Sequence, residues 1–224
     1  MSGISVRNQI YALIFDDITS WCYRNCLSYF HPGATILDVG IGNGIMMKHF
    51  HQLIREKELS IIGIDINKTY LNQCNGYIEC FNLEDHIQIQ NAPIEQYEPP
   101  ARPYFDYILF SMSFMLFEDQ RLVLDRIKNW LKPQGQLVFF QTLFKEKLRL
   151  IEFIKPKLNY LTTIDFGRIT YEDAFYNLLQ EKGVTVVKDR LIKKEWFKGE
   201  YRMIVANPEN GTGPKKSPPP SATG

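Results

Sequence analysis

Two aspartates and a cluster of glycines are the residues of this sequence whose types and spacing point most directly to chemistry. Asp38 ends a short apolar run, and the loop that follows it reads Gly40, Ile41, Gly42, Asn43 and Gly44. Glycines allow a tight turn and a close approach of the backbone to a ligand. A helix that begins after such a loop offers free N–H groups to that ligand. The pattern therefore predicts a binding loop between a strand and a helix.

The spacing of the glycines argues against two nucleotide-phosphate sites. A dinucleotide fingerprint needs the order G-x-G-x-x-G, and from Gly40 the last position falls on Ile45. A P-loop needs a Gly-Lys-Ser/Thr sequence, which does not follow here. A carboxylate at Asp38 would repel a diphosphate, but it would attract an ammonium group through charge and a hydrogen bond. The loop therefore predicts a cationic or zwitterionic ligand.

A second carboxylate completes the ligand's description. Asp65 ends the next buried-strand pattern and follows Gly44 by 21 residues (65 − 44). A ribose-binding acid is expected roughly 20 residues after such a loop, where its carboxylate can accept both ribose hydroxyls. A ligand with an amino-acid-like end and a ribose fits both aspartates. S-adenosyl-L-methionine has both groups and is the cofactor we predict.

Composition limits the remaining classes. The 224 residues fit one domain with modest additions, since a domain takes about 100–200 residues. The net charge of +1 gives no overall signature of nucleic-acid binding. The sequence has no apolar run of about 18 residues that would span a membrane, and its first residues, MSGISVRNQI, lack the apolar run typical of a signal peptide. Its four cysteines do not suggest a disulfide scaffold, so we expect a cytoplasmic protein.

The elements that must position these residues alternate along the chain. Apolar β-rich runs alternate with helical patterns, which predicts βαβ units and a mostly parallel, doubly wound α/β sheet. The last two β-rich runs have no helix between them and should pair antiparallel. The expected strands are 35–40, 60–65, 86–90, 105–111, 135–141, 184–193 and 194–207, and the expected helices are 7–30, 45–57, 68–81, 118–130 and 171–182.

The ends of the chain differ from its middle. We expect an N-terminal helical segment over residues 1–32, a cofactor-binding domain over 33–206, and a disordered tail rich in proline, glycine and serine over 207–224. Thr170 and Asp173 have the spacing of a capping box for the last helix. Cys22 and Cys26 stand four residues apart on a predicted helix, and we interpret them as buried thiols and not as metal ligands.

Five segments together resemble the class I S-adenosylmethionine-dependent methyltransferases. ILDVGIGNG resembles the family's first motif and IIGIDIN its second, while IQNAPIEQYEP resembles the third and FDYILFSMSFMLFED the fourth. WLKPQGQLVFF resembles the LKPGG-type turn before the fifth strand. The resemblance covers about residues 30–206. It implies a Rossmann-like fold of seven strands with the last pair antiparallel.

The resemblance also implies roles for residues beyond the two aspartates. Ile66, Asn91, Ala92 and Ser111 would join the loop in binding the cofactor, with Asn91 and Ala92 near the adenine. The family often has aspartate where Asn91 stands, and asparagine keeps an acceptor for the adenine amino group. The resemblance further implies that the N-terminal helical segment is a lid over the cofactor, with contacts from Tyr11 and Phe15. The acceptor pocket is expected to involve Phe114, Gln141, Phe144 and Tyr160.

The function expected is methyl transfer to a small or medium-sized metabolite, as in the similar ubiquinone/menaquinone-type methyltransferases. The N-P-P-Y type of tetrapeptide found in enzymes that methylate base amines is absent after the fourth strand, where the sequence reads Ser-Met-Ser-Phe. Two alternatives stay open: a protein or RNA methyltransferase, and a catalytically silent cofactor-binding subunit. The sequence identifies no catalytic residue and leaves the oligomeric state undefined.

Overall fold

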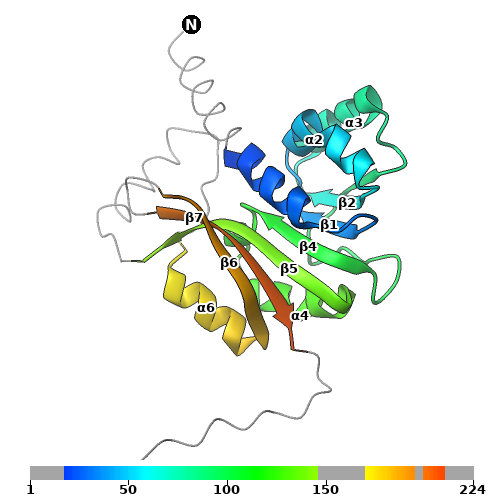
Figure 1. Cartoon of the computed structure of the whole chain (residues 1–224). Helices are drawn as coiled ribbons and strands as arrows, with labels where there is room; N and C mark the ends of the chain where they lie inside the picture. Colours follow the sequence, from blue (N-terminus) through cyan, green and yellow to red (C-terminus); the bar gives the residue numbers. More distant parts are fainter. Residues whose placement is uncertain (1–17, 146–169, 195–198, 210–224) are drawn as a thin grey trace, which may run out of the picture.

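The computed structural model describes residues 18–145, 170–194 and 199–209, and these form a sheet of seven strands with helices on both faces (Figure 1). The strands lie in the order β3-β2-β1-β4-β5-β7-β6. Their bounds are β1 Thr35–Val39, β2 Ser60–Asp65, β3 Ile87–Asn91, β4 Phe105–Ser111, β5 Leu131–Phe144, β6 Val184–Lys194 and β7 Gly199–Pro208. The helices are α2 Ile45–Glu56, α3 Lys68–Phe81, α4 Gln120–Ile127 and α6 Glu172–Glu181, with short 3-10 turns η1 Phe114–Leu116 and η2 Lys128–Trp130.

The pairing confirms the predicted fold class. β1 pairs in parallel with β2 and β4, and β2 with β3 and β4 with β5 are also parallel. β7 runs antiparallel to both β5 and β6, as the absence of a helix between the last two runs indicated. Because β1 lies between β2 and β4, the chain reverses its direction of winding there. Ligands of open α/β sheets bind at such a point, outside the carboxyl ends of the strands.

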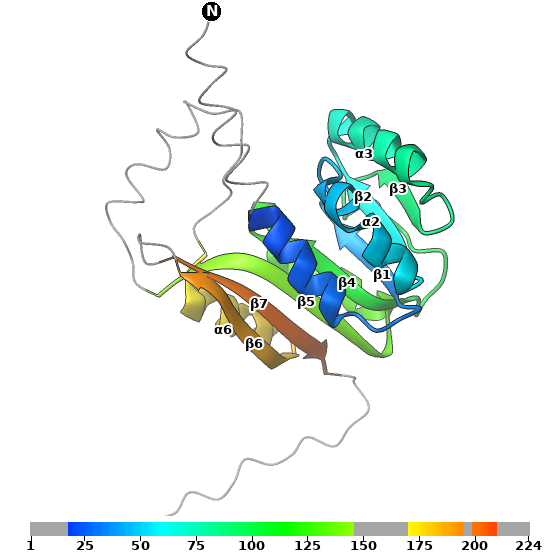
Figure 2. The same cartoon turned by 45° about the horizontal axis from the view of Figure 1, so that its top comes forward.

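Two apolar layers cover the sheet. Residues 18–29, which are helical, pack with α2 and α3 on one face, and α4 and α6 pack on the other (Figures 1 and 2). The central strands alternate their side chains between the two layers: Ile36 and Leu109 face the first, and Leu37 and Ile108 face the second. Burial on both faces explains why these strands are almost continuously apolar.

The starts of α3 and α4 follow local signals. The Asn67 side chain accepts hydrogen bonds from Thr69 N and Tyr70 N at the start of α3. The Asp119 carboxylate accepts one from Leu122 N at the start of α4. These contacts satisfy N–H groups that have no partner inside a helix, as side chains of this type do at helix starts.

The predicted capping box at Thr170 is wrong. α6 begins after Tyr171, and no side-chain cap hydrogen bond is present. The backbone of Thr170 is used elsewhere, because its carbonyl accepts a hydrogen bond of 3.0 Å from Phe144 N at the end of β5. Tyr171 also forms a parallel bridge with Phe144. Pairing with the end of β5 therefore keeps this stretch extended, so that the helix begins one residue later than the capping pattern predicted.

The LKPQG segment also differs from expectation. The helix before it does end at Trp130, in the 3-10 turn η2, but the segment itself belongs to β5. Its pairing with β4 shifts register, since Phe105 pairs with Leu131 and Tyr107 with Gln136. An irregularity of this kind accommodates extra residues within a strand, so the proline and glycine lie in the shifted region and do not delay the start of β5.

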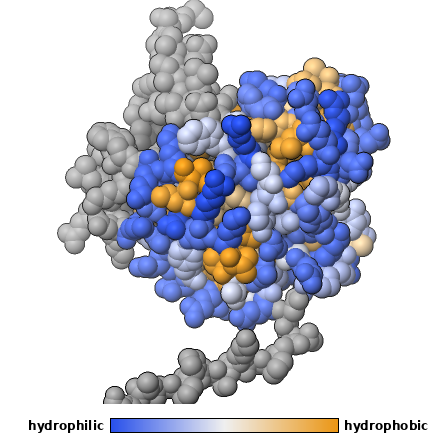
Figure 3. All heavy atoms as spheres, viewed as in Figure 1, coloured by the Kyte–Doolittle hydropathy of each residue, from blue (hydrophilic) through white to orange (hydrophobic). Residues whose placement is uncertain are grey.

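The surface is mainly hydrophilic, with separate hydrophobic patches on the face shown in Figure 3. On β6, which forms one edge of the sheet, Val187 is 51% exposed and Leu191 is 41% exposed. Cys22 and Cys26 are fully buried, which confirms the interpretation of both as core thiols. No helix among the described residues is long and apolar enough to cross a membrane.

One lysine connects the N-terminal helical segment to the rest of the fold. Lys57 Nζ, just after α2, donates to the carbonyl oxygens of Leu27, Ser28 and Phe30 at 2.8, 2.9 and 2.6 Å. These are carbonyls at the end of residues 18–29, where a helix has no internal donors and where its dipole favours a positive charge. Lys57 therefore helps to fix this helix against the sheet.

Replacing Lys57 tests that connection. We expect Lys57→Met to lower the free energy of unfolding by about 1.5–3 kcal/mol, the usual contribution of hydrogen bonds to a charged group. Urea denaturation measures the change. Lys48→Met is the matched control, because Lys48 is an exposed lysine of α2, and surface changes usually stay within about 0.5 kcal/mol. Equal stability of the two variants would contradict the proposed role.

Candidate functional site

The glycine loop begins where β1 ends, and it folds back onto β2. Gly40 N and Ile41 N both donate to Ile64 O, at 2.8 and 3.2 Å. Gly40 has φ +80°, and a Cβ atom placed on it would lie 2.7 Å from Ser113 Cβ. Only glycine meets both conditions without strain. The loop therefore lies directly against the segment that follows β4.

Asp65 organises this end of the sheet. Its Oδ2 accepts a hydrogen bond of 2.9 Å from Gly42 N, and its Oδ1 accepts one of 2.8 Å from Asn67 N. Its backbone carbonyl accepts a further bond of 2.9 Å from the Asn91 side-chain amide. One residue thus connects the ends of β1, β2 and β3, and it is only partly buried, so its carboxylate oxygens retain acceptor capacity toward solvent.

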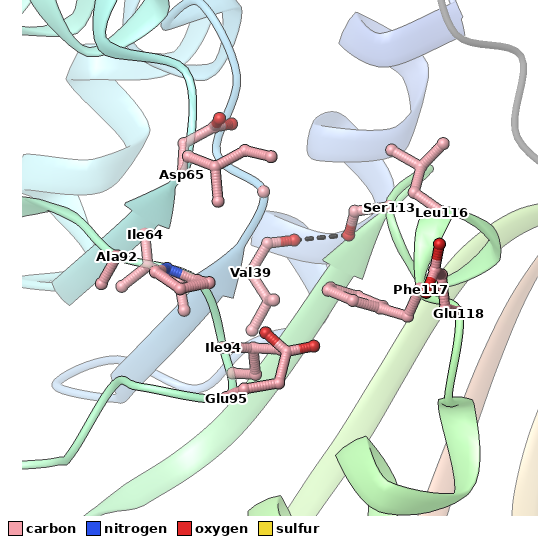
Figure 4. A pocket seen from close by; sticks show the side chains of 13 residues that line it. Val39, Ile64, Asp65, Ala92, Ile94, Glu95, Ser113, Leu116, Phe117 and Glu118 are labelled. Atoms are coloured by element: carbon pink, nitrogen blue, oxygen red, sulfur yellow. Dashed lines mark hydrogen bonds between the residues drawn. The ribbon is translucent and has the colours of Figure 1, made fainter.

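A cavity of about 350 Å³ opens between these strand ends and the segment after β4 (Figure 4). Ser113 Oγ donates to Val39 O and closes one side of it. Apolar side chains form most of the wall, and three carboxylates lie around it, those of Asp65, Glu95 and Glu118. The lining residues are Val39, Gly40, Ile64, Asp65, Ile66, Ala92, Pro93, Ile94, Glu95, Ser113, Leu116, Phe117 and Glu118.

Asp38 lies behind the loop and is fully buried. Its Oδ2 accepts a hydrogen bond of 2.8 Å from the Tyr23 hydroxyl, and its Oδ1 has no hydrogen-bond partner among the described residues. The pKa of Asp38 is raised to about 7, mainly by burial. The charge of Asp65 also raises this pKa, and the Tyr23 hydrogen bond partly offsets the rise. A buried carboxylate with a free oxygen is suited to a cationic partner.

The predicted cofactor residues fall into three groups. Gly40, Asp65, Ile66 and Ala92 line the cavity. Asp38, Ile41 and Ser111 are buried and do not line the cavity, and Ile41 packs in the apolar layer that includes α2 and α3. The remaining residues contribute through the loop or through Asp65: Gly42, Asn43, Gly44 and Asn91. The structure therefore brings the predicted set to one end of the sheet, although fewer than half of its members line the cavity.

The predicted acceptor residues are more scattered. Phe114 does not line the cavity; it is 1% exposed and packs edge-to-face on Phe139 in the core. Gln141 is 1% exposed, and within the part of the chain that the structure describes neither polar atom of its side chain has a hydrogen-bond partner. Phe144 is half-buried at the end of β5, beside Gly199. Tyr11, Phe15 and Tyr160 lie outside the described residues.

Several cavity residues were not identified from the sequence. Glu95, Ser113, Phe117 and Glu118 lie in the segments after β3 and β4. Their only signal in the sequence is position, since both segments follow strands whose carboxyl ends must meet at one edge. Which side chains turn inward depends on the path of each segment, and Ser113 does so because it reaches Val39 O.

Comparison with known proteins agrees with this geometry. A family model described as "Methyltransferase domain" matches residues 30–183, and the chain belongs to that family. A ubiquinone/menaquinone biosynthesis C-methyltransferase, UbiE, of Wigglesworthia glossinidia brevipalpis is 30% identical over 158 residues, which is 67% of this chain and 58% of that protein. N-methyltransferase 4 of Papaver somniferum is 25% identical over 178 residues, covering 74% of this chain and 49% of that one.

The shares of each chain that are covered also show how far the likeness extends. The chain spans only 58% and 49% of the lengths of these two relatives. Among solved structures, a geranyl diphosphate methyltransferase in complex with SAM superposes with a TM-score of 0.68, covering 84% of this chain and 85% of that one. Its sequence identity is 14%, so this similarity concerns the fold.

A substitution in the loop tests its close approach to Ser113. We expect Gly40→Ala to destabilise the fold by at least about 1–2 kcal/mol, the cost of a left-handed backbone for a residue with a Cβ. Gly76→Ala is the control, because Gly76 lies in α3 with no atom within 4 Å of an added Cβ. That change should be neutral or stabilising by about 0.5–1 kcal/mol. Urea denaturation measures the free energy of unfolding of both variants. An unchanged free energy of unfolding in Gly40→Ala would refute the close contact with Ser113.

Proposed function

We propose that this chain transfers the methyl group of S-adenosylmethionine to a small-molecule acceptor. The observation that carries the proposal is the charge of the site. Three carboxylates and no lysine or arginine are found among the described residues that line the cavity. Such a lining suits a cationic ligand and opposes a phosphate-bearing nucleotide.

The residues present fit this cofactor. The Asp65 carboxylate is the group that would accept ribose hydroxyls, and the apolar side chains of Ile66, Ala92 and Phe117 would cover an adenine. The unpartnered Oδ1 of Asp38 would accept from an ammonium group. When bound, S-adenosylmethionine supplies an electrophilic methyl group on a sulfonium.

The chain's own contribution is binding and orientation. Methyl transfer is a displacement, and correct placement of the reacting groups can supply about 7–11 kcal/mol of barrier reduction in ideal cases. The sequence and structure identify no general base, and an acceptor that is already a good nucleophile would not require one. A small-molecule acceptor is supported by the curated relatives, whose names describe C- and N-methyltransferases.

Cofactor affinity tests the assignment of the binding site. We expect Asp65→Ala to weaken binding of S-adenosylmethionine by about 10- to 150-fold, because a hydrogen bond to a charged group contributes about 1.5–3 kcal/mol. Isothermal titration calorimetry measures this. Asp85→Ala is the control, since Asp85 is an exposed aspartate at the other end of the sheet, next to the start of β3. Unchanged affinity in Asp65→Ala would show that the ribose site is placed wrongly.

Label transfer tests the reaction itself. Incubating the protein with methyl-labelled S-adenosylmethionine and a fractionated cell extract should place label in the small-molecule fraction. Label in protein or RNA would overturn the acceptor class but keep the activity. Binding of the cofactor without transfer to any fraction would instead favour a silent cofactor-binding subunit.

A further inference from the structure

The N-terminal helical segment reaches the carboxyl ends of two central strands with neighbouring residues. Cys22 Sγ lies 3.1 Å from Ser111 Oγ at the end of β4. The next residue, Tyr23, donates from its hydroxyl to Asp38 Oδ2 in β1 at 2.8 Å, with Ile41 O 3.4 Å away. Tyr23 is 1% exposed. A side chain from outside the sheet therefore contacts the carboxylate that the proposed function assigns to the cofactor's ammonium group.

The surroundings of Asp38 explain why this contact matters. The titratable groups that face Asp38 are Tyr23 and Cys22 from the N-terminal segment, Cys74 from α3 and Asp65 from β2. Among the described residues no lysine, arginine or histidine forms an ion pair with Asp38. A buried carboxylate without a positive partner is costly unless hydrogen bonds compensate it, and the Tyr23 hydroxyl supplies the one hydrogen bond found.

We propose that Tyr23 is a positioning residue, which binds one oxygen of Asp38 and leaves the other directed at the amine of the cofactor. This inference rests on the proposed function, because it concerns the same cofactor. Tyr23 acts through Asp38 and needs no contact with the reacting atoms. It would make the docking of the N-terminal helical segment part of the cofactor site.

A pH dependence follows from this arrangement. An ammonium group binds the ionised form of Asp38, so affinity should fall as the pH drops through the pKa of Asp38, which burial raises to about 7. The Tyr23 hydrogen bond lowers that pKa. Removing this hydrogen bond therefore raises the pKa of Asp38 and moves the acid limb of the affinity profile to higher pH. Burial also raises the pKa of the Cys22 and Cys74 thiols, so neither contributes a competing titration in the acid range.

The experiment compares two probes that differ in the group at issue. S-adenosylhomocysteine carries the amine, whereas 5′-methylthioadenosine has the same adenosyl part and no amino-acid end. For Tyr23→Phe we expect binding of S-adenosylhomocysteine to weaken about tenfold at pH 7, and its acid midpoint to rise by about one pH unit. Binding of 5′-methylthioadenosine should stay within about twofold of wild type, because no charged contact is lost. Titration calorimetry between about pH 5.5 and 8.5 covers the acid limb of both the unmodified protein and the variant.

Tyr29→Phe is the matched control. Tyr29 lies on the same helical segment and its hydroxyl donates to Gln136 Oε1 at 2.7 Å, away from the loop. In this variant the affinities for both probes and the acid midpoint should stay unchanged. The positioning role would be overturned if Tyr23→Phe weakened the binding of both probes equally, or if it changed the binding of neither.

The unmodified protein provides a test that does not depend on how a variant folds. Its affinity for S-adenosylhomocysteine should show an acid limb, while that for 5′-methylthioadenosine should be flat. Equal profiles for the two probes would overturn the inference but leave the proposed function standing. Failure of the protein to bind S-adenosylmethionine and both probes would instead refute the proposed function.

Discussion

The hydrogen bonds of Asp65 are the interaction on which the site depends. A parallel sheet brings the ends of its strands to one edge, but it does not fix the loops that continue from them. The two carboxylate oxygens of Asp65 accept from the backbone of Gly42 and Asn67, and its carbonyl accepts from Asn91. Three segments that are distant in sequence are thereby held in register. The same carboxylate remains partly open to solvent, so under the proposed function one side chain would serve both structural support and ligand recognition.

The two aspartates divide the work because their environments differ. Asp38 is enclosed between the N-terminal helical segment and the loop, where water cannot stabilise its charge. Asp65 lies at the mouth of the cavity. Asp38 strongly favours a positive partner, since among the described residues only the Tyr23 hydrogen bond compensates its charge, whereas the partly exposed Asp65 can accept neutral hydroxyls with little electrostatic cost. The fold thus places two identical side chains in environments that suit the different partners proposed for them.

The sequence allowed the sheet to be predicted because apolar runs, helix periodicity and turn residues all agreed. Asp119 caps its helix as an acidic start suggested. Thr170 failed as a cap because a distant partner, the end of β5, took its backbone, and no local pattern encodes that pairing. Likewise, the Phe114 side chain is directed into the core by its packing on Phe139. Glu118 lines the cavity because of the path that the segment after β4 takes. Tertiary contacts decided each of these cases, whereas the strand-end aspartates followed from position alone.

The edge strand β6 has a consequence for the behaviour of the protein at high concentration. An unpaired strand edge can recruit strands from other molecules and begin aggregation. The register of β6 with β7 shifts twice, near Val186 and near Leu191, which interrupts a straight template. Lys188 and Arg190 lie between the exposed Val187 and Leu191, Lys193 and Lys194 follow them, and the intervening Asp189 is paired with Arg202. An approaching copy would therefore meet mostly like charges. Irregular geometry and positive charge together protect an otherwise long open edge from amyloid-like stacking.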